Sequence, residues 1–315
     1  MSLERALAFA ERGRGTTHPN PVVGCVLVND GEVVGEAWHE QAGGPHAEVI
    51  ALQQAGERAR GATAYVTMEP CTHHGRTPPC TDALIAAGVA AVMAGSRDPH
   101  PDHGGGLERL GGEGVAVALA DGELAFRCRA QNEAWRTWVS LGRPFVILKL
   151  AVTLDGRVTV PGQRWVTGEA ARLRVHELRA HVDAVAVGMG TVRADEPQLT
   201  ARDVESARQP RRLAFGRGPL PDGSDLELRS GALPNELRAL ADDGVQSLLL
   251  EGGPTLAASF LRENLVDKML VFVAPQLAGS GPLLLPDLGT TVPLTRLRAE
   301  QVGEDVLLTA YVHEP

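Results

Sequence analysis

Three residues in the first half of the chain are of the types that bind zinc. His46 lies in PHAEV (45–49), and Cys71 and Cys80 enclose the segment THHGRTPP. Zinc in proteins is tetrahedral and favours imidazole and thiolate ligands, and a catalytic site supplies three protein ligands and leaves the fourth position for water. We therefore predict that His46, Cys71 and Cys80 hold a catalytic zinc ion.

Glu48 is the expected catalytic residue of this site. It follows His46 by two positions, which is close for a second ligand but places its carboxylate beside water that the metal acidifies. A carboxylate there can accept a proton from the water and deliver it to a leaving amine. Cys80 follows two prolines at an expected helix start, where the helix dipole favours an anionic sulfur.

A histidine, a glutamate two residues later, and then Pro-Cys and a second cysteine are typical of zinc-dependent deaminases. In this chain eight residues separate Cys71 from Cys80, where the general pattern has two. One alternative is a structural zinc site with His73 or His74 as a fourth ligand. Another is a deaminase of nucleic-acid bases, but the formal net charge of −9 is unfavourable for nucleic-acid binding.

The elements expected around these residues are strands that alternate with helices, which predicts an α/β fold with a partly parallel sheet. In the first half we expect strands over 22–28, 32–38, 62–68, 89–94 and 115–119, and helices over 3–13, 46–56, 80–88, 105–112 and 122–141. The turn Asn29-Asp30-Gly31 predicts a hairpin. Gly142-Arg143-Pro144 then indicates a boundary between a deaminase domain (1–143) and a second domain (144–315).

The second half repeats the α/β alternation. We expect a first strand at FVILKLAVT (145–153), further strands over 182–188, 211–215, 246–250, 268–273 and 305–312, helices over 168–180 and 254–264, a short helix before 246, and loops over 190–203 and 216–234. No GxGxxG motif follows a strand, so a Rossmann fingerprint is not found. LLLEGGPTL instead predicts a strand, a glycine turn and a helix start, whose free amides can bind a pyrophosphate.

The composition suits a folded protein of two domains: the chain has 315 residues, of which 43% are hydrophobic. No apolar run approaches the roughly 18 residues of a membrane span. Glu4 and Arg5 stand where a signal peptide is apolar, so we expect a cytoplasmic protein without a membrane partner. Cys25 and Cys128 are expected to be buried or inert.

Several segments resemble the bifunctional deaminase/reductases of riboflavin biosynthesis over nearly the whole chain. The matching segments are HPNPVVGCVLV (18–28), WHEQAGGPHAEVIAL (38–52), EPCTHHGRTPPC (69–80), KLAVTLDGRV (149–158), RWVTGEAAR (164–172), LRAHVDAVAVGMGTVRADEPQLTAR (178–202), LLEGGPTLAASFL (249–261) and LVDKMLVFVAPQLAGS (265–280). Their order agrees, and the long cysteine spacing is what this family shows.

The resemblance implies a cytidine-deaminase-like α/β/α layer domain followed by a dihydrofolate-reductase-like α/β domain. The first would deaminate 2,5-diamino-6-ribosylamino-4(3H)-pyrimidinone 5′-phosphate with Zn²⁺, and the second would reduce the ribosyl group to ribityl with NADPH. The partner is then a small pyrimidine ribose phosphate and not nucleic acid, and we expect a homo-oligomer.

For the deaminase, the resemblance assigns the metal to His46, Cys71 and Cys80 and the proton transfer to Glu48. It implies substrate contacts at Asn20, His39, His73, Arg76, Thr77 and Asp98. Two positions depart from the family: Arg76 stands where lysine is frequent, and His100 stands where asparagine is usual. His74 and His103 are expected at the surface.

For the reductase, the resemblance implies cofactor contacts at Ala151, Trp165, Thr191, Asp195, Gly253, Pro254, Thr255, Leu256, Ala257, Ala258 and Ser259. Substrate contacts are implied at Gln163, Arg179, Leu199, Arg202 and Glu251, although Arg179 on a helix is equally typical of a solvated surface charge. The chain after Arg212 is shorter than in the family, where this region helps enclose the adenosine of the cofactor. This leaves the alternative of a deaminase whose second domain is a weakly active or inactive scaffold.

Overall fold

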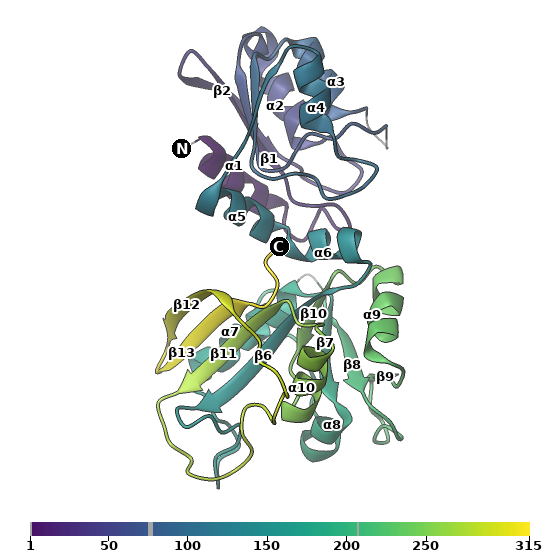
Figure 1. Cartoon of the computed structure of the whole chain (residues 1–315), viewed down its shortest axis with the longest axis vertical. Helices are drawn as coiled ribbons and strands as arrows, with labels where there is room; N and C mark the ends of the chain where they lie inside the picture. The colour runs from purple at the N-terminus through teal and green to yellow at the C-terminus, as the bar shows by residue number, and fades with distance from the viewer. Residues whose placement is uncertain (1, 75–77, 207) are drawn as a thin grey trace. The chain divides into compact units, whose positions relative to one another are not determined.

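The computed structural model describes residues 2–74, 78–206 and 208–315, which form two compact units (Figure 1). The first contains Met1–Leu141 and Pro315, and the second contains Gly142–Glu314. None of the described helices has the length and apolar character needed to cross a membrane. The predicted Arg76 and Thr77 lie outside the described residues.

The N-terminal unit has a five-stranded sheet in the order β2-β1-β3-β4-β5. Its strands are β1 (Gly24–Asn29), β2 (Glu32–Trp38), β3 (Thr63–Val66), β4 (Ala91–Ala94) and β5 (Ala116–Leu119). β1 is antiparallel to β2 and β3, whereas β3, β4 and β5 are parallel. Asp30 and Gly31, with φ of 49° and 80°, form the hairpin turn that the sequence predicted.

Helices pack on both faces of this sheet. Successive side chains of a strand point to opposite faces, so neighbouring residues contact different helices. Leu27 packs with Ala51 of α2 and Leu84 of α3, whereas its neighbour Val26 packs with Leu7 of α1. The helices are α1 (Ser2–Ala10), α2 (Ala47–Ala55), α3 (Cys80–Ala87), α4 (Gly106–Gly112), α5 (Gly122–Gln131) and α6 (Glu133–Leu141). The predicted α/β/α layers are confirmed.

The single helix predicted over 122–141 is wrong, because Asn132 divides it into α5 and α6. Asn132 leaves the helical conformation with φ −119° and ψ 27°. Its side-chain amide is buried and pairs with the backbone of Val22, accepting from the amide at 2.9 Å and donating to the carbonyl at 2.8 Å. A local helical pattern does not contain this long-range contact.

The C-terminal unit has an eight-stranded sheet in the order β12-β13-β11-β6-β10-β7-β8-β9. The strands are β6 (Phe145–Thr153), β7 (Ala184–Gly188), β8 (Arg211–Phe215), β9 (Glu227–Arg229), β10 (Ser247–Leu250), β11 (Lys268–Ala274), β12 (Thr295–Val302) and β13 (Asp305–Tyr311). The six from β11 to β9 are parallel, and β12 and β13 add an antiparallel ribbon. The helices are α7 (Glu169–His181), α8 (Met189–Asp195), α9 (Leu233–Asp242) and α10 (Pro254–Arg262).

Three elements of this unit differ from the prediction. α8 lies in the expected loop 190–203, β9 in the expected loop 216–234, and β12 in a segment for which no element was predicted. α8 has seven residues and β9 three, so neither is long enough to show a clear hydrophobic period. β12 is an edge strand with a mostly exposed, polar sequence, TRLRAEQV.

Candidate active sites

The three predicted zinc ligands lie together in the N-terminal unit. His46 is the N-cap of α2, Cys80 is the first residue of α3, and Cys71 lies between β3 and α3. His46 Nδ1 is 3.1 Å from Cys80 Sγ and 3.6 Å from Cys71 Sγ, and the three candidate ligand atoms lie within 4.8 Å of one another.

This geometry fits a tetrahedral metal ion. Zinc bonds of about 2.0–2.3 Å place tetrahedral ligand atoms roughly 3.3–3.8 Å apart, close to the observed separations. Within the described part of the chain the group contains these three residues and neither His73 nor His74. The alternative of a structural site with one of those histidines as fourth ligand is therefore not supported.

Glu48 completes the site from the first turn of α2. Its side chain is buried, and Oε2 has no hydrogen-bond partner. A buried carboxylate oxygen without a partner is costly, and burial raises the pKa of Glu48. Such an oxygen is suited to accept and release a proton within the site.

The surroundings of the cysteine pair favour the anionic form of Cys71. A hydrogen bond from Cys80, together with contacts from His46 and the Cys80 amide, lowers the pKa of Cys71 to about 4. The Cys80 amide donates to Cys71 Sγ at 3.4 Å. These contacts favour the thiolate of Cys71, which is the form of cysteine that binds zinc.

A cavity of about 560 Å³ opens beside these residues. Of the predicted substrate residues, it is lined by Asn20, His39, His73 and Asp98. His39 Nδ1 lies 3.0 Å from the carbonyl oxygen of Pro45, and Nε2 lies 3.3 Å from Asn20 Nδ2. His39 thus donates to Pro45 and accepts from Asn20, and burial lowers its pKa, which favours this neutral form.

Three imidazoles form a stack in the wall of the cavity. The ring of His103 lies between those of His73 and His100, with centroid separations of 3.6 Å on both sides. All three residues line the cavity, so the expected surface position of His103 is wrong, whereas His74 is exposed as predicted. Trp135 and Trp138 of α6 also line the cavity and were not predicted.

In the C-terminal unit, Arg179 and Glu251 are paired. Arg179 Nε and Nη2 donate to the two carboxylate oxygens of Glu251 at 2.6 and 3.0 Å. Lys149 Nζ lies 3.7 Å from Glu251 Oε2. Burial disfavours the charge of Glu251, but Lys149 and Arg179 outweigh it and lower its pKa. The paired Arg179 is therefore not a solvated surface charge. Lys149 was not predicted as a site residue, because the sequence of its strand reads as continuous core.

Thr191 and the predicted cofactor residues from Gly253 to Ser259 lie just after the ends of β7 and β10. Gly188 is the N-cap of α8 and Gly253 that of α10, and neither helix has a side-chain cap. Thr191 lies close to Gly253, since a Cβ atom added to this glycine would be 3.6 Å from Thr191 Oγ1. Uncapped amides at adjacent helix starts fit the phosphates of a dinucleotide.

The remaining predicted residues of this unit lie on several elements. Ala151 is in β6, Asp195 ends α8, and Pro254–Ser259 form the first turns of α10. Gln163 Nε2 donates to Gln276 Oε1 at 3.4 Å, and Arg202 donates to Gln198 Oε1. Leu199 is buried with a positive φ of 55°, whereas Trp165 is 55% exposed.

Comparison with known proteins identifies the family of each unit. Residues 2–96 match the family model of the cytidine and deoxycytidylate deaminase zinc-binding region, and residues 144–308 match that of the RibD C-terminal domain. The riboflavin biosynthesis proteins RibD of Aquifex aeolicus and Escherichia coli are 39% and 40% identical to the chain, and each alignment covers 97% of this chain and at least 96% of the relative. The chain belongs to the RibD family.

Solved RibD structures agree over the full length. RibD from Acinetobacter baumannii superposes with a TM-score of 0.86 at 35% identity, covering 98% of this chain and 97% of that one. A diaminohydroxyphosphoribosylaminopyrimidine deaminase/5-amino-6-(5-phosphoribosylamino)uracil reductase from Thermotoga maritima gives 0.83 at 33% identity, with the same coverage.

The chain is accordingly a bifunctional deaminase/reductase of riboflavin biosynthesis, with a zinc-binding deaminase domain and a reductase domain. The match of the C-terminal unit over residues 144–308 does not favour the alternative of an inactive scaffold.

Proposed function

We propose that the N-terminal unit deaminates 2,5-diamino-6-ribosylamino-4(3H)-pyrimidinone 5′-phosphate and that the C-terminal unit reduces the ribosyl group of the product with NADPH. We place the deaminase in residues 1–143 and the reductase in 144–315. The observation that carries the proposal is the unpartnered, buried Oε2 of Glu48 beside the triad of His46, Cys71 and Cys80 at the cavity.

Proton transfer by Glu48 is the central step. When bound, zinc supplies Lewis-acid chemistry that makes water a nucleophile at neutral pH. Glu48 accepts a proton as water adds to the carbon that bears the amine, and it delivers a proton to that amine as ammonia leaves. Because burial raises the pKa of Glu48, the carboxylate holds the proton more readily between these two events.

Substrate recognition in the deaminase is assigned to polar residues that line the cavity and to the segment between the cysteines. Asn20 is fixed by His39 and is assigned to the pyrimidine ring, because an amide both donates and accepts hydrogen bonds. His39 is assigned to hold Asn20 and to contact the ribose. The phosphate is assigned to His73, Arg76 and Thr77 of the segment between the cysteines, and Asp98 to a polar group of the substrate.

In the reductase, Arg179 and Glu251 form one end of the proposed substrate site. Gln163, Leu199 and Arg202 complete it, with Arg202 as a phosphate ligand. The starts of α8 and α10 are assigned to the phosphates of NADPH through Thr191 and residues 253–259, and Ala151, Trp165 and Asp195 to other parts of the cofactor. The shorter chain after Arg212 predicts weaker binding of the adenosine end.

Mass spectrometry of the products tests both activities on the full chain. With the diaminopyrimidine phosphate and zinc alone, the substrate mass rises by about 1 Da as an amine is replaced by oxygen. Addition of NADPH then adds about 2 Da. A first product that never gains the second increment, at any NADPH concentration, would leave the chain a deaminase alone.

We further propose that the chain acts in the cytoplasm as a homo-oligomer. Sedimentation of the purified chain measures the oligomeric state directly. A single species of 33.3 kDa across the concentrations used in the assay would refute the proposed homo-oligomer.

A further inference from the structure

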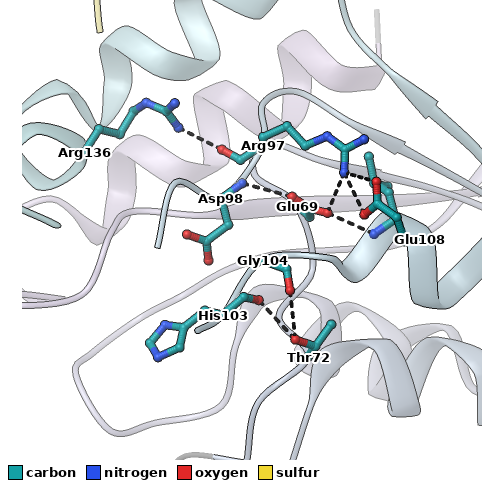
Figure 2. A network of polar contacts seen from close by, with 9 residues as sticks. Glu69, Thr72, Arg97, Asp98, His103, Gly104, Glu108 and Arg136 are labelled. Atoms are coloured by element: carbon teal, nitrogen blue, oxygen red, sulfur yellow. Dashed lines mark hydrogen bonds and ion pairs between the residues drawn. The ribbon is translucent and has the colours of Figure 1, made fainter. Parts of the chain in front are cut away.

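The loop of residues 98–105, between β4 and α4, forms one wall of the deaminase cavity. It carries Asp98, His100 and His103, all of which line the cavity. A loop keeps such side chains in place only where its backbone is held by the rest of the fold. The bonds that hold this backbone are shown in Figure 2.

Glu69 holds the loop at both ends. Its Oε2 accepts from the amide of Asp98 at 3.1 Å (Figure 2). Its Oε1 accepts from the amide of Leu107, just after the loop, at 3.0 Å. The Leu107 amide lies in the first turn of α4, where helical amides have no partner within the helix. The Glu69 side chain is 1% exposed, so its carboxylate oxygens bond groups within the protein.

The charge of Glu69 is balanced by Arg97, whose Nη1 donates to Oε1 at 3.2 Å. Arg97 also bonds Glu108 at 2.6 and 2.8 Å, and its carbonyl accepts from Arg136 of α6 at 2.8 Å (Figure 2). A buried carboxylate that accepts two amides and an arginine is well satisfied. Removal of one acceptor therefore leaves a buried amide without a partner.

Thr72 holds the middle of the loop. Its hydroxyl lies 3.0 Å from the Gly104 carbonyl and 3.3 Å from the His103 carbonyl, to which its amide also donates at 3.3 Å. Gly106 lets the loop approach this segment closely, because a Cβ atom there would lie 1.9 Å from the Pro70 carbonyl oxygen. The residues on both sides of Cys71 thus contact the loop.

We propose that Glu69 and Thr72 are positioning residues of the deaminase, which hold the 98–105 loop so that Asp98, His100 and His103 face the bound substrate. Residues 69–72 then serve two purposes: Cys71 would hold the metal, and its neighbours set the distance between the metal ligands and the substrate wall. The inference rests on the proposed function of the cavity.

The test compares variants that keep shape but change hydrogen bonding. Thr72→Val removes the hydroxyl, Thr72→Ser keeps it, and Glu69→Gln replaces one acceptor oxygen by a donor. Thr63→Val in β3 and Glu113→Gln after α4 are matched controls. For each full-length variant we would measure kcat and KM for the diaminopyrimidine phosphate, zinc content, and hydrogen exchange of peptides spanning 97–108.

We expect Thr72→Val and Glu69→Gln to raise KM about tenfold, the effect of one lost buried hydrogen bond. Zinc content and kcat stay within twofold of wild type, exchange over 97–108 becomes faster, and Thr72→Ser behaves as wild type. A KM within twofold of wild type in Thr72→Val, or a fall in zinc content that accounts for the loss of activity, overturns the proposal.

The two proposals fail separately. If the wild-type chain does not deaminate the diaminopyrimidine phosphate, the proposed function is refuted. Hydrogen exchange still tests the positioning, because unchanged exchange over 97–108 in both Thr72→Val and Glu69→Gln shows that neither side chain holds the loop. Since Thr72 is half-buried and Val has nearly the same shape, this variant remains informative even if Glu69→Gln fails to fold.

Discussion

His46 Nδ1 lies 3.1 Å from Cys80 Sγ, and the two residues occupy the starts of two helices, α2 and α3. The partial positive charge at a helix start stabilises a thiolate. The same geometry puts Glu48 in the first turn of α2, beside the ligand that precedes it. The proposed metal ligand His46 and the proposed proton carrier Glu48 are therefore held by one helical turn.

Glu48→Gln should abolish deamination while leaving the metal in place. The amide has the same shape but cannot carry a proton, so we expect kcat to fall by about 10²–10⁴-fold. Zinc content, measured by mass spectrometry of the metal, should stay at the wild-type value, and reduction of the deaminated substrate should not change. Full deaminase turnover in this variant would falsify the role of Glu48.

Gly106→Ala should disturb the deaminase cavity, whereas Gly111→Ala in the same helix should not. The added Cβ at Gly106 would lie 1.9 Å from a backbone carbonyl, but that at Gly111 lies an ordinary 3.7 Å from Val117. We expect Gly106→Ala to raise KM and lower the free energy of unfolding by about 1–3 kcal/mol. Gly111→Ala should raise that free energy by about 0.5–1 kcal/mol, as alanine does in helices. Equal denaturation midpoints of the Gly106→Ala and Gly111→Ala variants would contradict this prediction.

Arg179→Met should impair the reductase more than Arg174→Met on the same helix. Arg179 is the bidentate partner of buried Glu251, so its loss should cost roughly 3–5 kcal/mol in the stability of the C-terminal unit. Arg174 pairs with Glu177 at the surface, where such pairs contribute about 0–1 kcal/mol. Chemical denaturation and NADPH oxidation measure both effects. Similar losses in the two variants would show that the Glu251 pair is not required.

Asp155 should contribute stability that depends on pH. A hydrogen bond from Thr153, followed by those from the amides of Ala278 and Gly279, lowers the pKa of Asp155 from 3.8 to about 2. Because the folded pKa is depressed, the contribution is complete above pH 3.8 and is lost as the pH falls through about 2. We expect Asp155→Asn to be less stable than wild type at pH 5, with the difference vanishing near pH 2.

Acid unfolding of the full chain, followed by hydrogen exchange of peptides spanning 145–160 and 274–282, measures this difference in the relevant unit. A difference between Asp155→Asn and wild type that persists unchanged down to pH 2 would show that the side chain acts by shape alone.

Much of the deaminase site could be predicted because its chemistry is carried by residue type and short spacing. Zinc requires imidazole and thiolate donors, and a carboxylate two residues after His46 falls in the same helical turn whatever surrounds it. The hairpin at Asp30-Gly31 was predictable for a similar reason, since its backbone needs positive φ at both positions. These are properties of neighbours in the chain.

Contacts between distant segments were decided by the tertiary structure. The sequence places Glu69 and Leu107 38 positions apart, and it places Lys149 on a strand that reads only as core, far from its partner Glu251. His103 was expected at the surface, but the loop held by Glu69 and Thr72 brings it into the cavity. Local propensity determines which elements form, whereas sheet order and loop bonding determine which side chains meet, and these depend on the packing of the whole unit.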